Sequence, residues 1–303
     1  MVRHGEPARG AWLVRVGEAE VSVPAPGGTP LVMARLGAGD LFGETALVEQ
    51  GICMAHVSAA TALDGWFVER EAFRGAVMRR GPEARDLQHA LTMHLADRLR
   101  GMNARLASVE AGEAEPRPPA PVAAEPRRSR TGSFDAARFL HRLPFFERFP
   151  ADEVDEVFAA GTVLELPRGA SLYRAGDAAG AVYVVIRGAV EIARTSAGGE
   201  RRLAVLGPGQ PVGFVGALAG GRHGAHATVR ESAALLEIPA DAFREIYFGE
   251  GGVSARVRAA AQRHLLVALA RTNRMLARLA AHARLSGAPP MAPGLWFSPP
   301  QSR

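Results

Sequence analysis

RHGEPARGAWLVRVGEAEV, residues 3–21, and RAGDAAGAVYVVIRGAVEI, residues 174–192, are two versions of one pattern, and this repeat decides the fold. Gly5 in the first stretch corresponds to Gly176 in the second. The correspondence continues, with a numerical offset that changes by only one, in Gly17 and Gly188, Gly39 and Gly209, Gly43 and Gly213, and Phe73 and Phe243. A nearly constant offset over so many landmarks indicates two copies of one structural unit.

Apolar and polar residues alternate between glycine turns in both copies, across residues 163–210 in the second and residues 11–40 in the first. Several short strands at such spacing predict a sandwich or a barrel. Residues 139–161, which precede the second copy's strands, read as short helices. The first copy has no counterpart of residues 134 to about 172, so we expect a domain truncated at its start. The missing leading helices and strand would leave barrel edges unpaired. One explanation is that the start of the chain is assigned too late. The alternative is that the second unit or another chain covers the unpaired edge.

Each copy ends in a helix with an apolar stripe spaced four and three residues apart. Such a stripe packs on its own barrel or pairs with a second helix as a short coiled coil, and the sequence leaves both open. One constant offset relates all positions of the stripes, which are Leu95, Leu99, Met102, Leu106 and Val109, then Leu265, Leu269, Thr272, Leu276 and Leu279.

The expected organisation has four parts. Residues 1–110 form the truncated first domain with its terminal helix, and residues 134–285 form a complete second domain with its own. Residues 111–133, rich in proline and charge, are expected to be a solvated linker, and residues 286–303 a proline-rich tail.

Composition excludes several classes. All 36 basic residues are arginine, so the pI near 10.4 mostly reflects that choice and is weak evidence for nucleic-acid binding. Cys53 is the only cysteine, which rules out an intrachain disulfide and favours a reducing cytoplasm. The charged start does not resemble a signal peptide, and no apolar run approaches the roughly 18 residues of a membrane span.

The repeated stretches, with LGAGDLFGETAL (36–47) and LAVLGPGQPVG (203–213), closely resemble the cyclic nucleotide-binding domain family, which includes catabolite-activator-type regulators and kinase regulatory subunits. The resemblance implies a mainly β fold with α: two tandem jelly-roll barrels, each a double-stranded β-helix followed by a long helix. It also implies a cyclic nucleotide, cyclic AMP or cyclic GMP, as the ligand.

In this family a glycine turn lets the backbone approach the cyclic phosphate and leads into a short helix whose N–H groups face it. A glutamate accepts from the ribose 2′-hydroxyl, and an arginine about ten residues later neutralises the phosphate. The resemblance places the first cassette at residues 42–61 and the second at residues 212–232. The binding residues that it implies are Gly43, Glu44, Thr45, Ala46, Cys53 and Met54 in the first cassette, and Gly213, Val215, Gly216, Arg222 and His226 in the second.

Both cassettes depart from the family pattern. Cys53 stands where the arginine belongs in the first, and a neutral thiol should weaken phosphate binding by roughly 2 to 4 kcal/mol. In the second, Phe214 replaces the glutamate and Ala225 falls near the arginine position, with Arg222 shortly before it.

On the terminal helices, catabolite-activator-like members use a polar pair to contact the base. Met102 with Asn103, and Thr272 with Asn273, match that pair. An asparagine on an exposed helix face is more often solvated, and this alternative stays open.

Enzymatic and metal chemistry are disfavoured. His223 and His226 lack the His-x-His and carboxylate set of cupin metal sites. Cys53 and His56, three apart in a strand, point to opposite faces, so Cys53 is expected to be a small buried residue rather than a nucleophile. DNA-binding members carry a helix-turn-helix after the long helix, and residues 286–303 are too short and proline-rich for one, so no direct DNA binding is expected.

Two functional hypotheses remain. The first is a non-enzymatic regulator that senses a cyclic nucleotide or related ligand and acts on a protein partner. The second is a degenerate, non-binding tandem that serves as a scaffold or homodimerises through its terminal helices.

Overall fold

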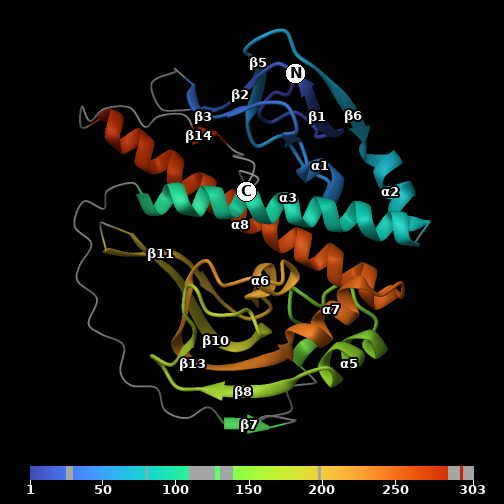
Figure 1. The fold of residues 1–303 in the computed structure, drawn as a ribbon, viewed down its shortest axis with the longest axis vertical. Coiled ribbons are helices and arrows are strands. Elements are labelled where there is room, and N and C mark those ends of the chain that lie inside the picture. The colour runs from blue at the N-terminus through green and yellow to red at the C-terminus, as the bar shows by residue number, and fades with distance from the viewer. Residues whose placement is uncertain are drawn as a thin grey trace. The chain divides into compact units, whose positions relative to one another are not determined.

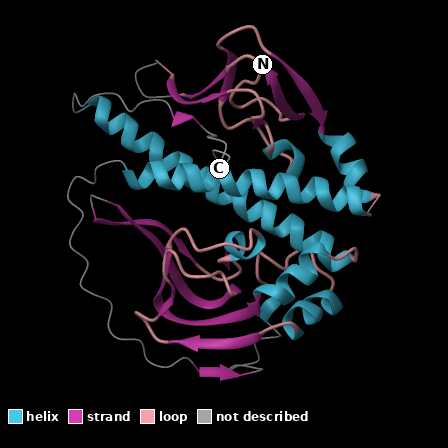
Figure 2. Ribbon diagram, viewed as in Figure 1, coloured by secondary structure: helices cyan, strands magenta, loops and turns pink. Residues whose placement is uncertain are grey.

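The protein is described by a computed structural model that covers residues 1–24, 30–79, 81–108, 127–129, 139–196, 199–285 and 294–295. Its contacts divide the chain into two compact units. The first unit comprises Met1–Leu106 and Leu265–Arg303, and the second comprises Ala107–His264. Each combines antiparallel strands with helices, which confirms the predicted mixture of β and α structure (Figure 1, Figure 2).

The first unit holds two small sheets around an apolar core. One sheet has the order β4-β1-β6 and the other β14-β3-β2-β5. Val14, Val21, Leu36, Phe42 and Val57 form the centre of the core. The elements are β1 (Gly10–Val16), β2 (Ala19–Val23), β3 (Leu31–Leu36), β4 (Leu41–Phe42), α1 (Thr45–Val48), β5 (His56–Ala59), β6 (Asp64–Glu69), α2 (Arg70–Met78), α3 (Pro82–Ser108) and β14 (Gly294–Leu295).

The second unit is built on one larger sheet, with the strand order β11-β10-β13-β8-β7. Long strands β10 and β13 pair over most of their length and carry the core. The elements are β7 (Arg127–Ser129), α5 (Ala151–Ala159), β8 (Thr162–Leu166), β9 (Ser171–Tyr173), β10 (Ala181–Ser196), β11 (Gly199–Leu206), β12 (Pro211–Val212), α6 (Phe214–Leu218), β13 (His226–Pro239), α7 (Ala240–Phe248) and α8 (Gly252–Leu285).

The repeat seen in the sequence is present in the backbone. Gly5 and Gly176 both have φ in the left-handed region, at 84° and 91°, and so do Gly17 and Gly188, at 91° and 84°. Glycine adopts this conformation without the steric cost that a side chain brings. The glycine pattern thus marks the same turns in both copies.

Most of the expected linker, 111–133, and of the expected tail, 286–303, lies outside the described residues. In the linker Arg127–Ser129 form β7, antiparallel to β8. In the tail Gly294–Leu295 form β14, parallel to β3. Across the described residues, no helix is both long and apolar enough to cross a membrane.

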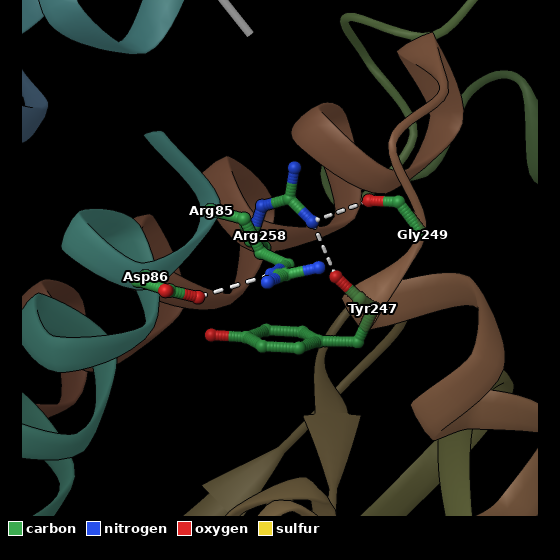
Figure 3. Close-up of polar contacts among 5 residues, drawn as sticks. All are labelled: Arg85, Asp86, Tyr247, Gly249 and Arg258. Atoms are coloured by element: carbon green, nitrogen blue, oxygen red, sulfur yellow. Dashed lines mark hydrogen bonds and ion pairs between the residues drawn. The ribbon is translucent and has the colours of Figure 1, made fainter. Parts of the chain in front are cut away.

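Helix α8 crosses from one unit to the other at Leu265. Its proximal part is fixed to the second barrel by Arg258, which is 4% exposed. The guanidinium Nη1 donates to the Tyr247 carbonyl and, at 3.0 Å, to the Gly249 carbonyl (Figure 3). These carbonyls end α7, where helical carbonyls have no partner in their own helix.

Gly188 is expected to tolerate a side chain far less than Gly176. Both have positive φ, but a Cβ on Gly188 would lie 2.8 Å from Ala233 Cα, whereas a Cβ on Gly176 would meet nothing within 4 Å. We expect Gly176→Ala to lower the free energy of unfolding by about 1–2 kcal/mol. Gly188→Ala should lower it by about 3 kcal/mol or more, because backbone must move as well. Urea unfolding checks this, and equal losses would contradict the packing.

Candidate functional site

The cassette of the first unit begins at a glycine whose backbone conformation and surroundings disfavour a side chain. Gly43 has φ of 79°, and a Cβ there would lie 2.7 Å from the Gly10 carbonyl oxygen of β1. The turn leads from β4 into α1, where Ala46 is fully buried. The close approach of β1 therefore fixes where Glu44 and Thr45 emerge.

Glu44 is 5% exposed and forms an ion pair with Nη1 of Arg98, on α3. Burial lowers the pKa of Arg98, and the Glu44 carboxylate opposes that shift. Burial also raises the pKa of nearby Asp40, although the Gly37 N–H donates to its carboxylate at 2.7 Å. The pair holds the cassette of the first unit to its long helix. Sequence reasoning did not select Arg98, because it is distant from Glu44 in the chain and lies on a helix whose facing could not be predicted.

A cavity of about 310 Å³ opens beside this pair, within the first unit. The cassette, the start of the chain and two helices line it. Its polar lining groups combine one carboxylate with two guanidinium groups, a hydroxyl, an imidazole and an amide. The lining residues are His4, Val23, Pro24, Glu44, Thr45, Met54, Arg98, Met102, Leu266, Leu269, Ala270, Asn273, Arg274 and Ala277.

Cys53 is half-buried rather than fully buried as predicted. Its N–H donates to the Glu6 carbonyl at 2.8 Å, and its carbonyl accepts from Gly5 N–H at 2.9 Å. Burial raises the pKa of the thiol, and the charge of Glu6 raises it further. The cassette thus offers a neutral thiol here, and the guanidinium groups at the cavity come from helices, in Arg98 and Arg274.

The sequence did not predict which residues of the two polar pairs, Met102–Asn103 and Thr272–Asn273, contact each other and which line the cavity. Thr272, 3% exposed, donates from Oγ1 to Asn103 Oδ1 at 3.2 Å, so α8 and α3 contact each other within the first unit. Asn273 and Met102 line the cavity together. Asn273 Oδ1 is buried and has no hydrogen-bond partner among the described residues. The second copy's helix therefore contributes its amide to the first copy's cavity.

The second cassette carries aromatic side chains beside its glycine turn. Gly213 has φ of 84° and is the N-cap of α6, whereas the N-cap of α1 is Glu44, the residue after Gly43. Phe214, in the glutamate position, is 4% exposed and packs edge to face on His264, with ring centroids 5.8 Å apart. Gly216 is buried, and a Cβ there would lie 2.8 Å from Ala179 Cβ. An apolar contact thus replaces the expected ribose acceptor.

A ring stack lies beside the same glycine turn. His223 is 7% exposed and lies parallel to Tyr173, with centroids 3.5 Å apart and planes 8° apart. A Cβ on Gly213 would lie 3.2 Å from His223 Cε1. Burial lowers the pKa of His223 and raises that of Tyr173. The imidazole therefore occupies space next to the glycine turn that a phosphate would approach.

The other residues singled out in this cassette serve the barrel. Arg222 is exposed and donates from Nη1 to the Gly176 carbonyl at 2.6 Å. His226 Nδ1 accepts from Ala175 N–H at 3.3 Å, and its Nε2 lies 3.1 Å from Thr195 Oγ1. Val215 is half-buried on α6. Within the described ranges, no group of three or more His, Cys, Asp or Glu side chains could hold a metal ion.

Comparison with known proteins agrees with this geometry. The family model for the cyclic nucleotide-binding domain matches residues 1–80 and 163–250, which together exceed half of the chain. The chain belongs to the cyclic nucleotide-binding domain family. The predicted jelly-roll fold in two tandem copies is thereby confirmed. Domains of this family are regulatory rather than catalytic.

Among relatives, the cyclic AMP receptor protein of Thermus thermophilus is 36% identical over 105 residues, which are 34% of this chain and 47% of the relative. The chain thus spans about half of that protein's length. The crystal structure of the Thermus thermophilus catabolite activator protein is similar at 30% identity and a TM-score of 0.34, over 47% of this chain and 61% of that one. The regulatory domain of Toxoplasma gondii PKA, crystallised with cAMP, matches at 18% identity and a TM-score of 0.35, over 84% of this chain and 78% of that one.

The buried His223 predicts a dependence of stability on acid pH. Its pKa lies below the ordinary 6.5 because burial disfavours the charged form, although Asp177 opposes this. The unfolded chain therefore takes up a proton at higher pH than the folded chain does, so stability falls as pH drops below 6.5 and is unaffected above it. His223→Phe keeps an aromatic ring on Tyr173. We expect this variant to show a smaller loss of the free energy of unfolding below pH 6.5 than the wild type, as measured by urea unfolding at several pH values.

His94 keeps part of the slope, because burial lowers its pKa as well. A wild-type slope in the His223→Phe variant would show that His223 does not titrate in this way.

Proposed function

We propose that this chain is a non-enzymatic signalling regulator that senses a cyclic nucleotide at the cavity of its first unit. The single observation that carries the proposal is the meeting of Glu44 and Asn273 at one cavity, a cassette carboxylate with a helix amide. Glu44 is paired with Arg98, whereas Asn273 Oδ1 has no hydrogen-bond partner among the described residues. Together they offer two hydrogen-bond acceptors, Glu44 for the ribose and Asn273 for the base of a bound nucleotide.

In the proposed complex Glu44 accepts a hydrogen bond from the ribose 2′-hydroxyl. Arg98 and Arg274, which line the cavity, supply positive charge for the cyclic phosphate in place of the residue at Cys53. Arginine suits this role because its planar fork matches phosphate oxygens. Binding is expected to be weaker than with a cassette arginine, because the helix guanidinium groups are not held by the glycine turn.

Asn273 gives the proposal a base preference. A buried carbonyl oxygen without a partner costs about 1–3 kcal/mol, and a ligand that donates to it relieves that cost. The N6 amino group of adenine is such a donor, whereas guanine presents the O6 acceptor at the equivalent position. Cyclic AMP is therefore the favoured ligand, and cyclic GMP the weaker one.

The signal is proposed to pass through the two long helices. The cavity is lined by the cassette, by α3 and by the distal half of α8, so a ligand that bridges them makes contacts that exist only when they are assembled. A protein partner that reads the state of these helices would receive the signal. The proposal does not include direct DNA binding. It places the protein in the cytoplasm.

A thermal-shift titration of the full chain with cyclic AMP and cyclic GMP tests the proposal. Each variant is compared with and without ligand, so changes in its own stability cancel. Ligand at about 100 times its Kd should stabilise by about 2.7 kcal/mol, and for a chain of this size that raises Tm by several degrees. We expect the rise to be larger with cyclic AMP, absent in Glu44→Ala, and unchanged in Arg222→Ala, which alters the second cassette.

Cys53→Arg strengthens the test where the wild-type affinity is low. An arginine at this position restores the charge-assisted contact, worth about 1.5–3 kcal/mol, and should tighten Kd about tenfold or more. Cys53→Ser is the matched control and should bind like the wild type. If neither the wild type nor Cys53→Arg shows a shift, the sensing proposal is wrong.

A second candidate function is a non-binding tandem that acts as a scaffold or dimerises through its helices. It is favoured by the second cassette, where Phe214 and His223 pack against the chain's own aromatic rings. The thermal-shift result separates the two, because a scaffold would show no stabilisation by either nucleotide in any variant.

A further inference from the structure

Helix α8 carries a row of arginines beside the cavity of the first unit. The whole helix, Gly252–Leu285, contains seven arginines and no acidic residue. In its distal part Arg271, Arg274 and Arg278 follow one another at spacings of three and four residues, so they share one face and span about 10 Å along the axis. We call these three residues the arginine row. Arg274 lines the cavity and is exposed to solvent, so the row passes the mouth of the cavity.

The positive charge of the arginine row is not neutralised within the described part of the chain. Among those residues, none of the three guanidinium groups has a hydrogen bond or an ion pair. Burial lowers the pKa of Arg271, and the charge of Arg274 lowers it further. Like charges three and four residues apart destabilise a helix. The helix dipole does not compensate, because it acts in the last turn and Arg278 lies seven residues before the end of α8.

The arginine row is present in only one copy of the repeat. The constant offset between the two helical stripes maps its three positions onto Gly101, Ala104 and Ser108 of α3. Arginines of α3 have acceptors within the first unit, which are Glu44 for Arg98, Asp97 for Arg100 and the Met33 carbonyl for Arg105. The helix of this fold therefore does not require the row. Its position at the mouth of a cavity points to an anionic ligand.

The size of the cavity and the length of the arginine row restrict the ligand. A cavity of about 310 Å³ is at the lower end of small-molecule sites, roughly 300–1,000 Å³, so it accommodates one nucleoside rather than two. Arg98 is already paired with Glu44, and burial keeps the Cys53 thiol neutral by raising its pKa. The positive charge that no carboxylate balances therefore lies along α8, over a length that one phosphate group does not cover.

We propose that the first unit also binds a linear adenine nucleotide with two or three phosphates, in competition with the cyclic nucleotide. The nucleoside occupies the cavity, the first phosphate contacts Arg274, and the phosphate chain continues along the arginine row to Arg278. Guanidinium groups suit this role because their planar fork matches phosphate oxygens. The inference rests on the proposed function in one respect, which is that Glu44 and Asn273 contact the ribose and the adenine.

Isothermal titration calorimetry of the full chain with adenosine, AMP, ADP and ATP tests the inference. Divalent cations are removed, because they would neutralise the phosphates. We expect the affinity to rise about threefold or more with each added phosphate, since each one gains a contact with an exposed arginine. Added salt should weaken the binding of ATP and leave that of adenosine unchanged, because salt screens exposed charges. Equal affinity for all four ligands would overturn the inference.

Two variants locate the phosphates along the helix. Arg274→Ala should weaken AMP, ADP and ATP alike, whereas Arg278→Ala should weaken ATP about threefold or more and leave AMP unchanged. Both side chains are exposed, so neither variant is expected to unfold the chain. Arg202→Ala is the matched control, because Arg202 is an exposed arginine on β11 of the second unit. Equal losses of ATP affinity in Arg202→Ala and Arg278→Ala would show nonspecific attraction and overturn the assignment.

Inorganic tripolyphosphate and cyclic AMP, titrated in parallel, separate the remaining outcomes. Tripolyphosphate should bind at least about tenfold more weakly than ATP, because it lacks the nucleoside, and equal affinity would overturn the nucleotide in favour of a general polyanion site. Binding of cyclic AMP without any gain from added phosphates would overturn this inference alone. A gain from added phosphates without binding of cyclic AMP would overturn only the proposed function. No binding of any nucleotide would overturn both.

Discussion

The ion pair between Glu44 and Arg98 is the contact on which the first unit's site depends. It joins the cassette, which the glycine turn holds against β1, to α3, which the Thr272–Asn103 hydrogen bond joins to the distal half of α8. Removing one partner of a buried pair is costly because the other charge is left in a poor environment. Any ligand that reaches Glu44 therefore acts on the contact that links barrel and helix. In the proposed function, the same two side chains therefore serve both stability and signalling.

The two copies place different kinds of side chain at their cassettes. In the first, a carboxylate and a guanidinium meet at the cassette and a cavity remains beside them. In the second, Phe214 packs edge to face on His264, and His223 stacks on Tyr173. Aromatic contacts bury apolar area without charged groups. The Glu44–Arg98 pair lies at the cavity that Asn273 of α8 also lines.

Sequence alone predicted what depends on local residue types. The paired glycines revealed the repeat because only certain turns require positive φ, as at Gly17 and Gly188. The two cassettes could be predicted to differ from the family pattern. Phe214 cannot accept a hydrogen bond as the family's glutamate does, and Cys53 cannot carry the positive charge of the family's arginine.

The rest depended on contacts between distant parts of the chain. The helix after Leu265 was assigned to the second domain, yet its contacts lie in the first unit. An apolar stripe does not say which of two similar surfaces it will cover. For the same reason the pairing of Arg98 with Glu44, and the assignment of Asn273 to the first cavity, required the folded structure.

The stoichiometry of cyclic AMP binding to the full chain tests the central claim most directly. Isothermal titration calorimetry should give one site per chain, because the first unit keeps a cavity with Glu44 and Asn273, while aromatic rings pack beside the glycine turn of the second cassette. Two sites per chain would contradict the account of the second cassette as one that does not bind the nucleotide. No binding would contradict the assignment of the cavity itself.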